Sequence, residues 1–360
     1  MTHPALQTQI CDTLGIEVPI IQAGMGFIAR AELAAAVSLA GGLGMIGSAS
    51  LSPEELRAEI RKVRERTDRP FGVDILFATS RRPTADVVTG QLASSVQAHV
   101  DVVFEERVPV LASGLGDPGP VIGQAHDLGM TVIALVGNTK NARRVVESGV
   151  DIVVAQGYDG GGHTGRVGTL SLLPAVLDAV DVPVIAAGGI GDGRGIAAVL
   201  AMGGVGVWMG TRFVASEEAF GHEKYKNRIA EIDDEGTIRT RCFSGKPCRM
   251  IRNQTTAAWE APELEARIRG FPKQFAVIRD WLGEDPYTTG RFEGKVETGA
   301  LAAGQSSAVI RKVLPTSEII QMLVAETEAA LDRLSAGRAG QSASSPAGTR
   351  DGLAPERSSP

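Results

Sequence analysis

One histidine lies inside a run of glycines in the stretch "QGYDGGGHTG", residues 156–165. Three consecutive glycines cost backbone entropy, so a chain that only had to turn would not need them. Gly160, Gly161 and Gly162 would let a flat ring lie against the main chain with no side chain in between. We predict that His163 has a catalytic or substrate-polarising role, with a structural hydrogen-bonding role as the alternative.

Two more glycine-rich turns follow apolar runs later in the chain. "AAGGIGDG" contains Gly188 and Gly189, and "GVGVWMGT" contains Gly210 and Thr211. The backbone N–H groups of such turns can approach an anion closely, and a following helix N-terminus favours negative charge. The pair of turns predicts a phosphate site, and tight turns without a ligand are the alternative.

The elements that would position these turns alternate between apolar strands and helices up to about residue 213, with one helix expected over residues 84–105. The strands are continuous apolar runs, as expected in a parallel sheet covered on both faces. Eight parallel strand–helix units are the number that closes a (β/α)₈ TIM barrel. A doubly wound open sheet is the alternative, but "QAGMGFIA" lacks the spacing of a dinucleotide fingerprint.

The loops after the strands of such a barrel meet at one end and form the active site. Ala23, Gly24 and Met25 end the first expected strand, Asp74 ends the third and Gln156 ends the sixth. A phosphate held after the seventh and eighth strands, with a flat group over the sixth, describes flavin mononucleotide (FMN). The pattern therefore predicts FMN as the cofactor.

The alternation stops after residue 215, so residues 1–215 are expected to form the barrel. Residues 216–313 are charged, then basic and irregular, and we interpret them as a mostly helical lid or small domain beside the barrel mouth. A helix returning to the barrel is expected over 314–335. Residues 336–360 cannot bury enough apolar surface to become ordered, so a disordered tail is expected.

At these residues the chain resembles the FMN-dependent nitronate monooxygenases, formerly called 2-nitropropane dioxygenases. That family shares its fold with the flavin-dependent enoyl-acyl carrier protein reductases. The resemblance covers about residues 10–320, and a lid segment, "FSGKPCRMIRN", is similar as well. The segments that carry it, in family order, are "PIIQAGMG", "AGGLGMIG", "PFGVDI", "QGYDGGGHTG", "VPVIAAGGIGDGRG" and "GTRF".

The resemblance implies that His163 is the active-site histidine and that FMN is bound. The positions that it places against the flavin ring or its phosphate are Ala23, Gly24, Met25, Gln156, Gly161, Gly162, Gly188, Gly189, Gly210 and Thr211. Asp74 departs from the family pattern, since Asn is usual there, and it is expected either to be protonated near the flavin or to have another partner. Asp159-Gly160 replaces the usual Glu-Ala, which suggests a more flexible loop.

Two reactions stay open. In the first, an alkyl nitronate is oxidised with O₂ to a carbonyl compound and nitrite, while His163 holds the nitro group or takes the α-proton. In the second, NAD(P)H reduces the flavin, which then reduces an enoyl thioester of coenzyme A or an acyl carrier protein. The phosphates of such partners could bind the basic residues of the lid, which are Arg239, Arg241, Lys246, Arg249 and Arg252. The alternative is that these residues form a solvated charged face.

An aldolase-like lyase is disfavoured, because Lys140 and the other lysines fall on expected helices or in the lid rather than at strand ends. Cys11, Cys242 and Cys248 suggest neither a disulfide framework nor a metal site. The net charge of −6 and the absence of a basic run argue against nucleic acid, and no apolar stretch is long enough to cross a bilayer. We expect a cytoplasmic enzyme with a small-molecule substrate, and a homo-oligomer is left open.

Overall fold

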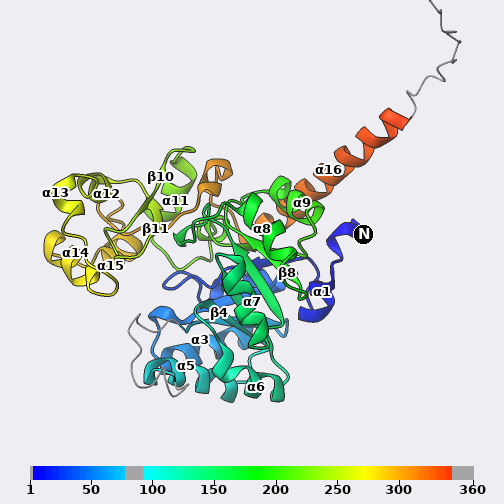
Figure 1. Ribbon diagram of the computed structural model, residues 1–360, viewed down its shortest axis with the longest axis horizontal. Helices are drawn as coiled ribbons and strands as arrows, with labels where there is room; N and C mark the ends of the chain where they lie inside the picture. Colours follow the sequence, from blue (N-terminus) through cyan, green and yellow to red (C-terminus); the bar gives the residue numbers. More distant parts are fainter. Residues whose placement is uncertain (1–2, 78–91, 343–360) are drawn as a thin grey trace, which may run out of the picture.

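The computed structural model describes residues 3–77 and 92–342. Within these residues, eight parallel strands form a barrel with helices on its outside (Figure 1). The strands are β1 (Ile20–Gln22), β2 (Gly44–Gly47), β3 (Phe71–Leu76), β4 (Val110–Leu115), β5 (Thr131–Val136), β6 (Ile152–Gln156), β8 (Val184–Ala187) and β9 (Val207–Met209).

Backbone hydrogen bonds between β1 and the residue before β2 close the barrel. The strands follow the order β1-β9-β8-β6-β5-β4-β3-β2, so β1 and β2 are the ends that must meet. Leu43 N donates to Ile20 O, and Gln22 N donates to Leu43 O, each at 3.0 Å. The (β/α)₈ barrel is therefore confirmed. The alternative of a doubly wound open sheet is wrong, because it would leave these two strands unpaired at opposite edges.

Helices follow the strands and cover the barrel. α3 (Pro53–Arg66) begins as its sequence indicates, because the Ser52 hydroxyl accepts from Glu55 N while the Glu55 carboxylate accepts from Ser52 N. The other covering helices are α2 (Ala31–Leu39), α5 (Ser94–Glu105), α6 (Gly119–Asp127), α7 (Thr139–Glu147), α8 (Thr169–Leu177) and α9 (Gly193–Ala201). Short 3₁₀ turns lie at η1 (Pro4–Leu6), η2 (Ser48–Ser50) and η3 (Gln305–Val309).

Alternate strand residues belong to two separate cores. Ile20 and Ile46 pack against the helices outside, whereas Ile21 and Met45 pack inside the barrel. α1 (Gln9–Leu14) contributes its buried side chains to the inner core, where the barrel strands begin. Because α1 covers that end, the site can open at the opposite end, where the strands finish.

The segment of residues 216–313 contains the expected helices and also a hairpin that the sequence did not reveal. The hairpin is formed by β10 (Thr237–Thr240) and β11 (Cys248–Ile251), and β7 (Gly162–His163) pairs with β11 as a third strand. In Figure 1 these strands lie between the barrel and a group of helices on one side. The helices after β9 are α10 (Thr211–Val214), α11 (Glu223–Glu231), α12 (Gln254–Ala258), α13 (Pro262–Glu265), α14 (Gln274–Leu282) and α15 (Pro286–Phe292).

The chain returns to the barrel through α16 (Thr316–Ser342), which packs on α9 and α2 before it extends outward (Figure 1). α16 continues past the predicted end at residue 335, and the rest of the predicted tail, 343–360, lies outside the described residues. The first part of the helix predicted over 84–105 also lies outside them. None of the helices in the described ranges is both long and apolar enough to cross a bilayer.

Close packing of α2 on β2 generates a stability prediction. A Cβ at Gly44 would lie 1.9 Å from the Ala34 carbonyl oxygen, so Gly44→Ala should lower the free energy of unfolding by about 3 kcal/mol. Gly123→Ala is the matched control, because its Cβ would meet nothing within 4 Å. Because Gly123 lies in the middle of α6, Gly123→Ala should raise the free energy of unfolding by about 0.5–1 kcal/mol. Urea unfolding measures both, and equal effects would contradict the packing.

Candidate functional site

A cavity of about 1010 Å³ opens where the barrel strands end. Strand ends, the loop before β7 and residues from the 216–313 segment line it together. All the site residues that the sequence predicts are brought together in this lining: Ala23, Gly24, Met25, Asp74, Gln156, Gly161, Gly162, His163, Gly188, Gly189, Gly210 and Thr211.

His163 is held in the cavity wall by the hairpin. In the antiparallel pairing of β7 with β11, His163 lies opposite Cys248 and Gly162 lies opposite Arg249. The Nε2 atom of His163 is 3.0 Å from the hydroxyl oxygen of the buried Ser244. The edge of the imidazole also contacts Phe271, with the ring centroids 6.4 Å apart. The orientation of the ring therefore depends on the 216–313 segment as well as on the barrel.

The environment of His163 keeps its imidazole neutral. Burial, together with the positive charges of Lys246 and Arg291, lowers the pKa of His163 to about 4. The Ser244 hydroxyl donates to the Lys246 carbonyl at 3.2 Å and accepts from Lys246 N at 3.3 Å, so the second lone pair of its oxygen can accept from His163 Nε2–H. Nδ1 is then the nitrogen with the lone pair, and it can accept a proton or a hydrogen bond.

Asp74 is a buried carboxyl group clamped between two glycines. A Cβ on Gly24 would lie 2.2 Å from Asp74 Cβ, and one on Gly114 would lie 2.5 Å from Asp74 Oδ1. Burial raises the pKa of Asp74 well above its ordinary value, although the Gly114 N–H offsets part of the increase. Within the described residues, Oδ1 has no hydrogen-bond partner. Of the two sequence expectations, protonation is favoured, since a neutral carboxyl carries a donor and an acceptor as an Asn amide does.

Other glycines of the site have different structural reasons. Gly162, Gly188 and Gly189 have φ values of +73°, +93° and +75°. Residues other than glycine rarely adopt this backbone conformation. A Cβ on Gly162 would meet nothing within 4 Å, so this main chain borders open space. A Cβ on Gly161 would instead lie 2.8 Å from the main chain at Gly304. Gly161 is therefore already required by protein packing.

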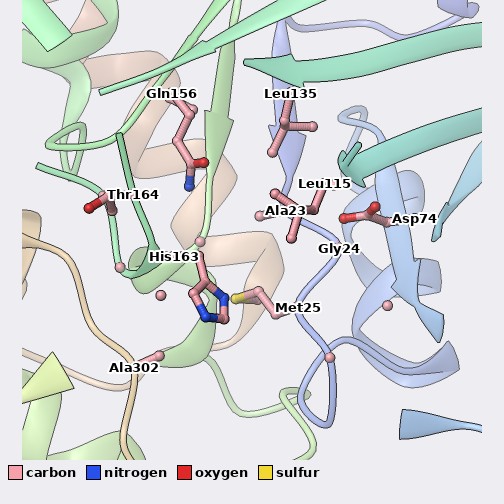
Figure 2. A pocket seen from close by; sticks show the side chains of 18 of the residues that line it. Ala23, Gly24, Met25, Asp74, Leu115, Leu135, Gln156, His163, Thr164 and Ala302 are labelled. Atoms are coloured by element: carbon pink, nitrogen blue, oxygen red, sulfur yellow. The ribbon is translucent and has the colours of Figure 1, made fainter. Parts of the chain in front are cut away.

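Gln156 supplies an amide to the same space. Figure 2 shows the side chains of Gln156, His163, Asp74 and Met25 reaching it from four separate segments, with Ala23 and Gly24 between them. In the part of the chain that the structure describes, the side-chain amide of Gln156 makes no hydrogen bond. Its carbonyl and NH₂ groups are therefore available to a ligand with a polar edge.

The loop that carries the glycines is anchored at both ends. The Asp159 carboxylate accepts from Thr169 N at 2.7 Å, where α8 begins, and the Asp159 carbonyl accepts from Gln305 N at 2.9 Å. Thr211 Oγ1 accepts from Gly304 N at 2.8 Å. Asp159 thus fastens the loop by bonds within the protein, which does not favour the greater flexibility that the sequence suggested.

The basic residues of the hairpin do not gather in the cavity. Arg239 and Arg249 lie over the Tyr158 ring, and each also donates to a backbone carbonyl. Arg252 pairs with Glu260. Of the five basic residues singled out in the sequence, Lys246 lines the cavity.

Sequence reasoning missed several residues of the site. Ser244 and Phe271 reach His163 from the 216–313 segment, and Phe27, Tyr287 and Arg291 line the cavity as well. The resemblance includes "FSGKPCRMIRN", which contains Ser244. Phe27 directly follows the strand-end motif "PIIQAGMG", which was a signal for its place. The sequence offered none for Phe271, Tyr287 and Arg291, because their places depend on how the segment folds back over the barrel.

A family model described as nitronate monooxygenase matches residues 7–326. This chain belongs to the nitronate monooxygenase family. One relative, from Mycobacterium tuberculosis, is 35% identical over 92% of this chain and 99% of its own length, and is named (3aS,4S,5R,7aS)-5-hydroxy-7a-methyl-1-oxo-octahydro-1H-indene-4-carboxyl-CoA dehydrogenase. A probable nitronate monooxygenase of Staphylococcus haemolyticus is 34% identical over 74% of this chain and 83% of its own.

The fold comparison agrees with the family. The structure of FabK from Thermotoga maritima superposes with a TM-score of 0.81 at 36% identity, over 92% of this chain and 99% of that one. The family resemblance predicted from the sequence is therefore confirmed, and the chain is an oxidoreductase.

The clamped carboxyl of Asp74 generates a pH prediction. Its raised pKa means that above about pH 4 the unfolded chain releases a proton that the folded chain keeps, so Asp74 costs stability as the pH rises. Asp74→Asn removes this dependence. As the pH rises from 4 to 8, the free energy of unfolding of the variant should increase relative to that of the wild type by up to about 1.4 kcal/mol per pH unit. Urea unfolding across this range measures the difference, and a wild type that gains on the variant would show that Asp74 is ionised in the folded state.

Proposed function

We propose that this chain is an FMN-dependent oxidoreductase that oxidises alkyl nitronates with O₂ to carbonyl compounds and nitrite. The observation that carries the proposal is a neutral His163 held at the edge of a cavity whose floor is bare main chain. A neutral imidazole can take the α-proton that converts a nitroalkane into the nitronate, and a bare main chain can carry a flat ring.

The residues present fit a flavin on several independent grounds. The main chain at Gly162 borders open space that a Cβ would enter. The amide of Gln156 and the orphaned Oδ1 of Asp74 offer hydrogen bonds to the polar edge of a ring. The left-handed turn at Gly188 and Gly189 would direct N–H groups to a phosphate.

When bound, FMN supplies the electron transfer that the side chains of the cavity cannot perform. His163 takes the α-proton at Nδ1 when the substrate arrives as a neutral nitroalkane, and Ser244 holds the Nε2 side of the ring. The 216–313 segment acts as a lid that excludes water from the substrate, because its residues Lys246, Phe271 and Tyr287 line the cavity.

A second candidate is redox chemistry on a thioester of coenzyme A, including NAD(P)H-dependent reduction of an enoyl thioester. It is favoured by the match to the M. tuberculosis protein named as a carboxyl-CoA dehydrogenase, which spans 92% of this chain. The cavity volume of about 1010 Å³ also lies at the upper end of the range for ligand pockets. A large substrate could therefore be accommodated.

Anaerobic stopped-flow absorbance separates the two candidates. The purified protein, reconstituted with FMN, is mixed with ethyl nitronate, NADH or NADPH, and the flavin absorbance is followed. Bleaching by the nitronate alone is the expected result, with return of the absorbance when O₂ is admitted. Bleaching by a pyridine nucleotide and none by the nitronate would reject the nitronate assignment in favour of the reductase.

The state of His163 generates a prediction for turnover. His163→Ala should keep FMN bound but lose at least about 100-fold of kcat/KM with nitroethane, since proton removal loses its base. Because the pKa of His163 is about 4, the wild-type profile of kcat/KM should show no ionisation of this histidine between pH 5 and 8. Steady-state oxygen consumption measures both. Unchanged turnover in the variant would assign His163 a structural role.

A further inference from the structure

We propose that Arg291 binds the anionic end of the substrate, a planar group with two oxygens such as a nitronate or a carboxylate. The inference rests on the proposed function in one respect, namely that the substrate occupies the cavity beside His163. It adds the residue that selects the charge and the shape of that substrate.

Arg291 is a buried cation that has no ionic partner among the residues the structure describes. Its side chain lines the cavity although the residue is only 7% exposed. Nε donates to the Ala300 carbonyl at 3.1 Å. In residues 3–77 and 92–342, no carboxylate lies within ion-pair distance of the guanidinium and no other hydrogen bond uses its remaining N–H groups. A buried charge left unpaired is costly, so the site is suited to a ligand that brings the missing negative charge.

The other charged groups of the cavity do not neutralise Arg291. Burial raises the pKa of Asp74 well above its ordinary value, which favours the neutral carboxyl. The Asp285 carboxylate caps the opposite end of α15, where it accepts from Tyr287 N and the Thr288 hydroxyl. Among the other cationic side chains that line the cavity, Arg144 pairs with Asp117. The charge of Arg291 is therefore not matched by either acid of the described cavity lining, which favours an anionic occupant.

Two aromatic rings fix the guanidinium in place. Its central carbon lies 4.8 Å from the ring centroid of Phe27 and 4.9 Å from that of Tyr287. Phe27 has a φ of +73°, a strained conformation for a residue with a side chain. A hydrogen bond from Phe27 N to the Ser50 hydroxyl, at 3.0 Å, helps to hold it. Strain retained at this position supports a functional role for the ring that contacts Arg291.

The ligand chemistry follows from the guanidinium. Its planar N–H groups match two oxygens in one plane, which both nitronates and carboxylates present, and a neutral nitroalkane or ester lacks the charge. Arg291 and His163 line the same cavity, and the charge of Arg291 also lowers the pKa of His163. Arg291 would hold the oxygens while His163 serves the neighbouring carbon.

The test compares anionic and neutral ligands in three variants. Arg291→Met removes the charge, and Arg291→Lys keeps the charge but not the planar guanidinium group. Arg252→Met is the control, because Arg252 is exposed and pairs with Glu260 on the same segment. Propionate and methyl propionate are titrated into the FMN-loaded protein by flavin absorbance. The concentration dependence of anaerobic bleaching gives the apparent affinity for ethyl nitronate. Thermal unfolding and flavin content are recorded for each variant.

We expect Arg291→Met to weaken ethyl nitronate binding at least 10-fold and Arg291→Lys to weaken it several-fold, with Arg252→Met unchanged. Methyl propionate should bind all variants within a factor of two. If Arg291→Met weakens the binding of propionate as much as that of ethyl nitronate, carboxylates are a second class of ligand. If it weakens the binding of ethyl nitronate alone, the site is specific for nitronates. Unchanged nitronate affinity, equal losses for charged and neutral ligands, or loss of FMN from folded Arg291 variants would overturn the proposal.

Failure of the proposed function would look different. If the wild type takes up no FMN, the flavin assignment fails, but the effect of propionate on the thermal unfolding midpoint still tests Arg291. Propionate should raise the midpoint of the wild type and of Arg252→Met, and it should raise that of Arg291→Lys by less at the same concentration. If Arg291→Met does not fold, Arg291→Lys carries the comparison. A midpoint that responds equally in all folded variants would contradict the role of Arg291.

Discussion

The pairing of two residues of the barrel loop with a strand of the 216–313 segment is the interaction on which the site depends. β7 consists of Gly162 and His163, and its partner β11 lies more than eighty residues later in the chain. This short ladder places the bare main chain of Gly162 and the imidazole of His163 side by side in one wall. It also brings Ser244 to Nε2 of His163. Without it, the imidazole of His163 would lose the contact that orients it, although Asp159 would still anchor the glycine loop.

Removal of water from these groups sets their chemistry. Burial lowers the pKa of His163 and raises that of Asp74, so it favours the neutral form of both groups. Arg291, by contrast, brings a guanidinium group that lacks a carboxylate partner among the described residues. The cavity therefore combines neutral proton-handling groups with an unsatisfied positive charge. Such a combination suits an anion, or a molecule that becomes one by losing a proton.

Much of the site could be predicted from the sequence because the barrel converts strand order into position. Once eight strands are identified, residues after each strand must meet at one end, and this brought Met25, Asp74, Gln156 and His163 together correctly. The reasons for individual glycines were harder to predict. Gly24 makes room for Asp74, and a ligand is not needed to explain it. A sequence does not reveal which neighbouring atoms would clash with a Cβ placed on a given glycine.

The residues contributed by the 216–313 segment could not be placed from the sequence. Its hairpin has no strict alternation to mark it, and its contacts with the barrel are set by tertiary packing. Arg291 illustrates what the sequence does not reveal. In the sequence it is one of many arginines, and its place at the end of a short helix does not distinguish it. Only the folded structure shows that it is buried, that Phe27 and Tyr287 contact it, and that no carboxylate of the described chain neutralises it.

The cofactor content of the purified protein tests the flavin assignment most directly. Visible absorbance gives the amount of flavin per chain, and mass spectrometry of the ligand released on denaturation gives its identity. One FMN per chain, present on purification or after reconstitution, is the result expected for a ring bound on the main chain at Gly162. A folded protein that stays colourless after incubation with FMN would contradict it.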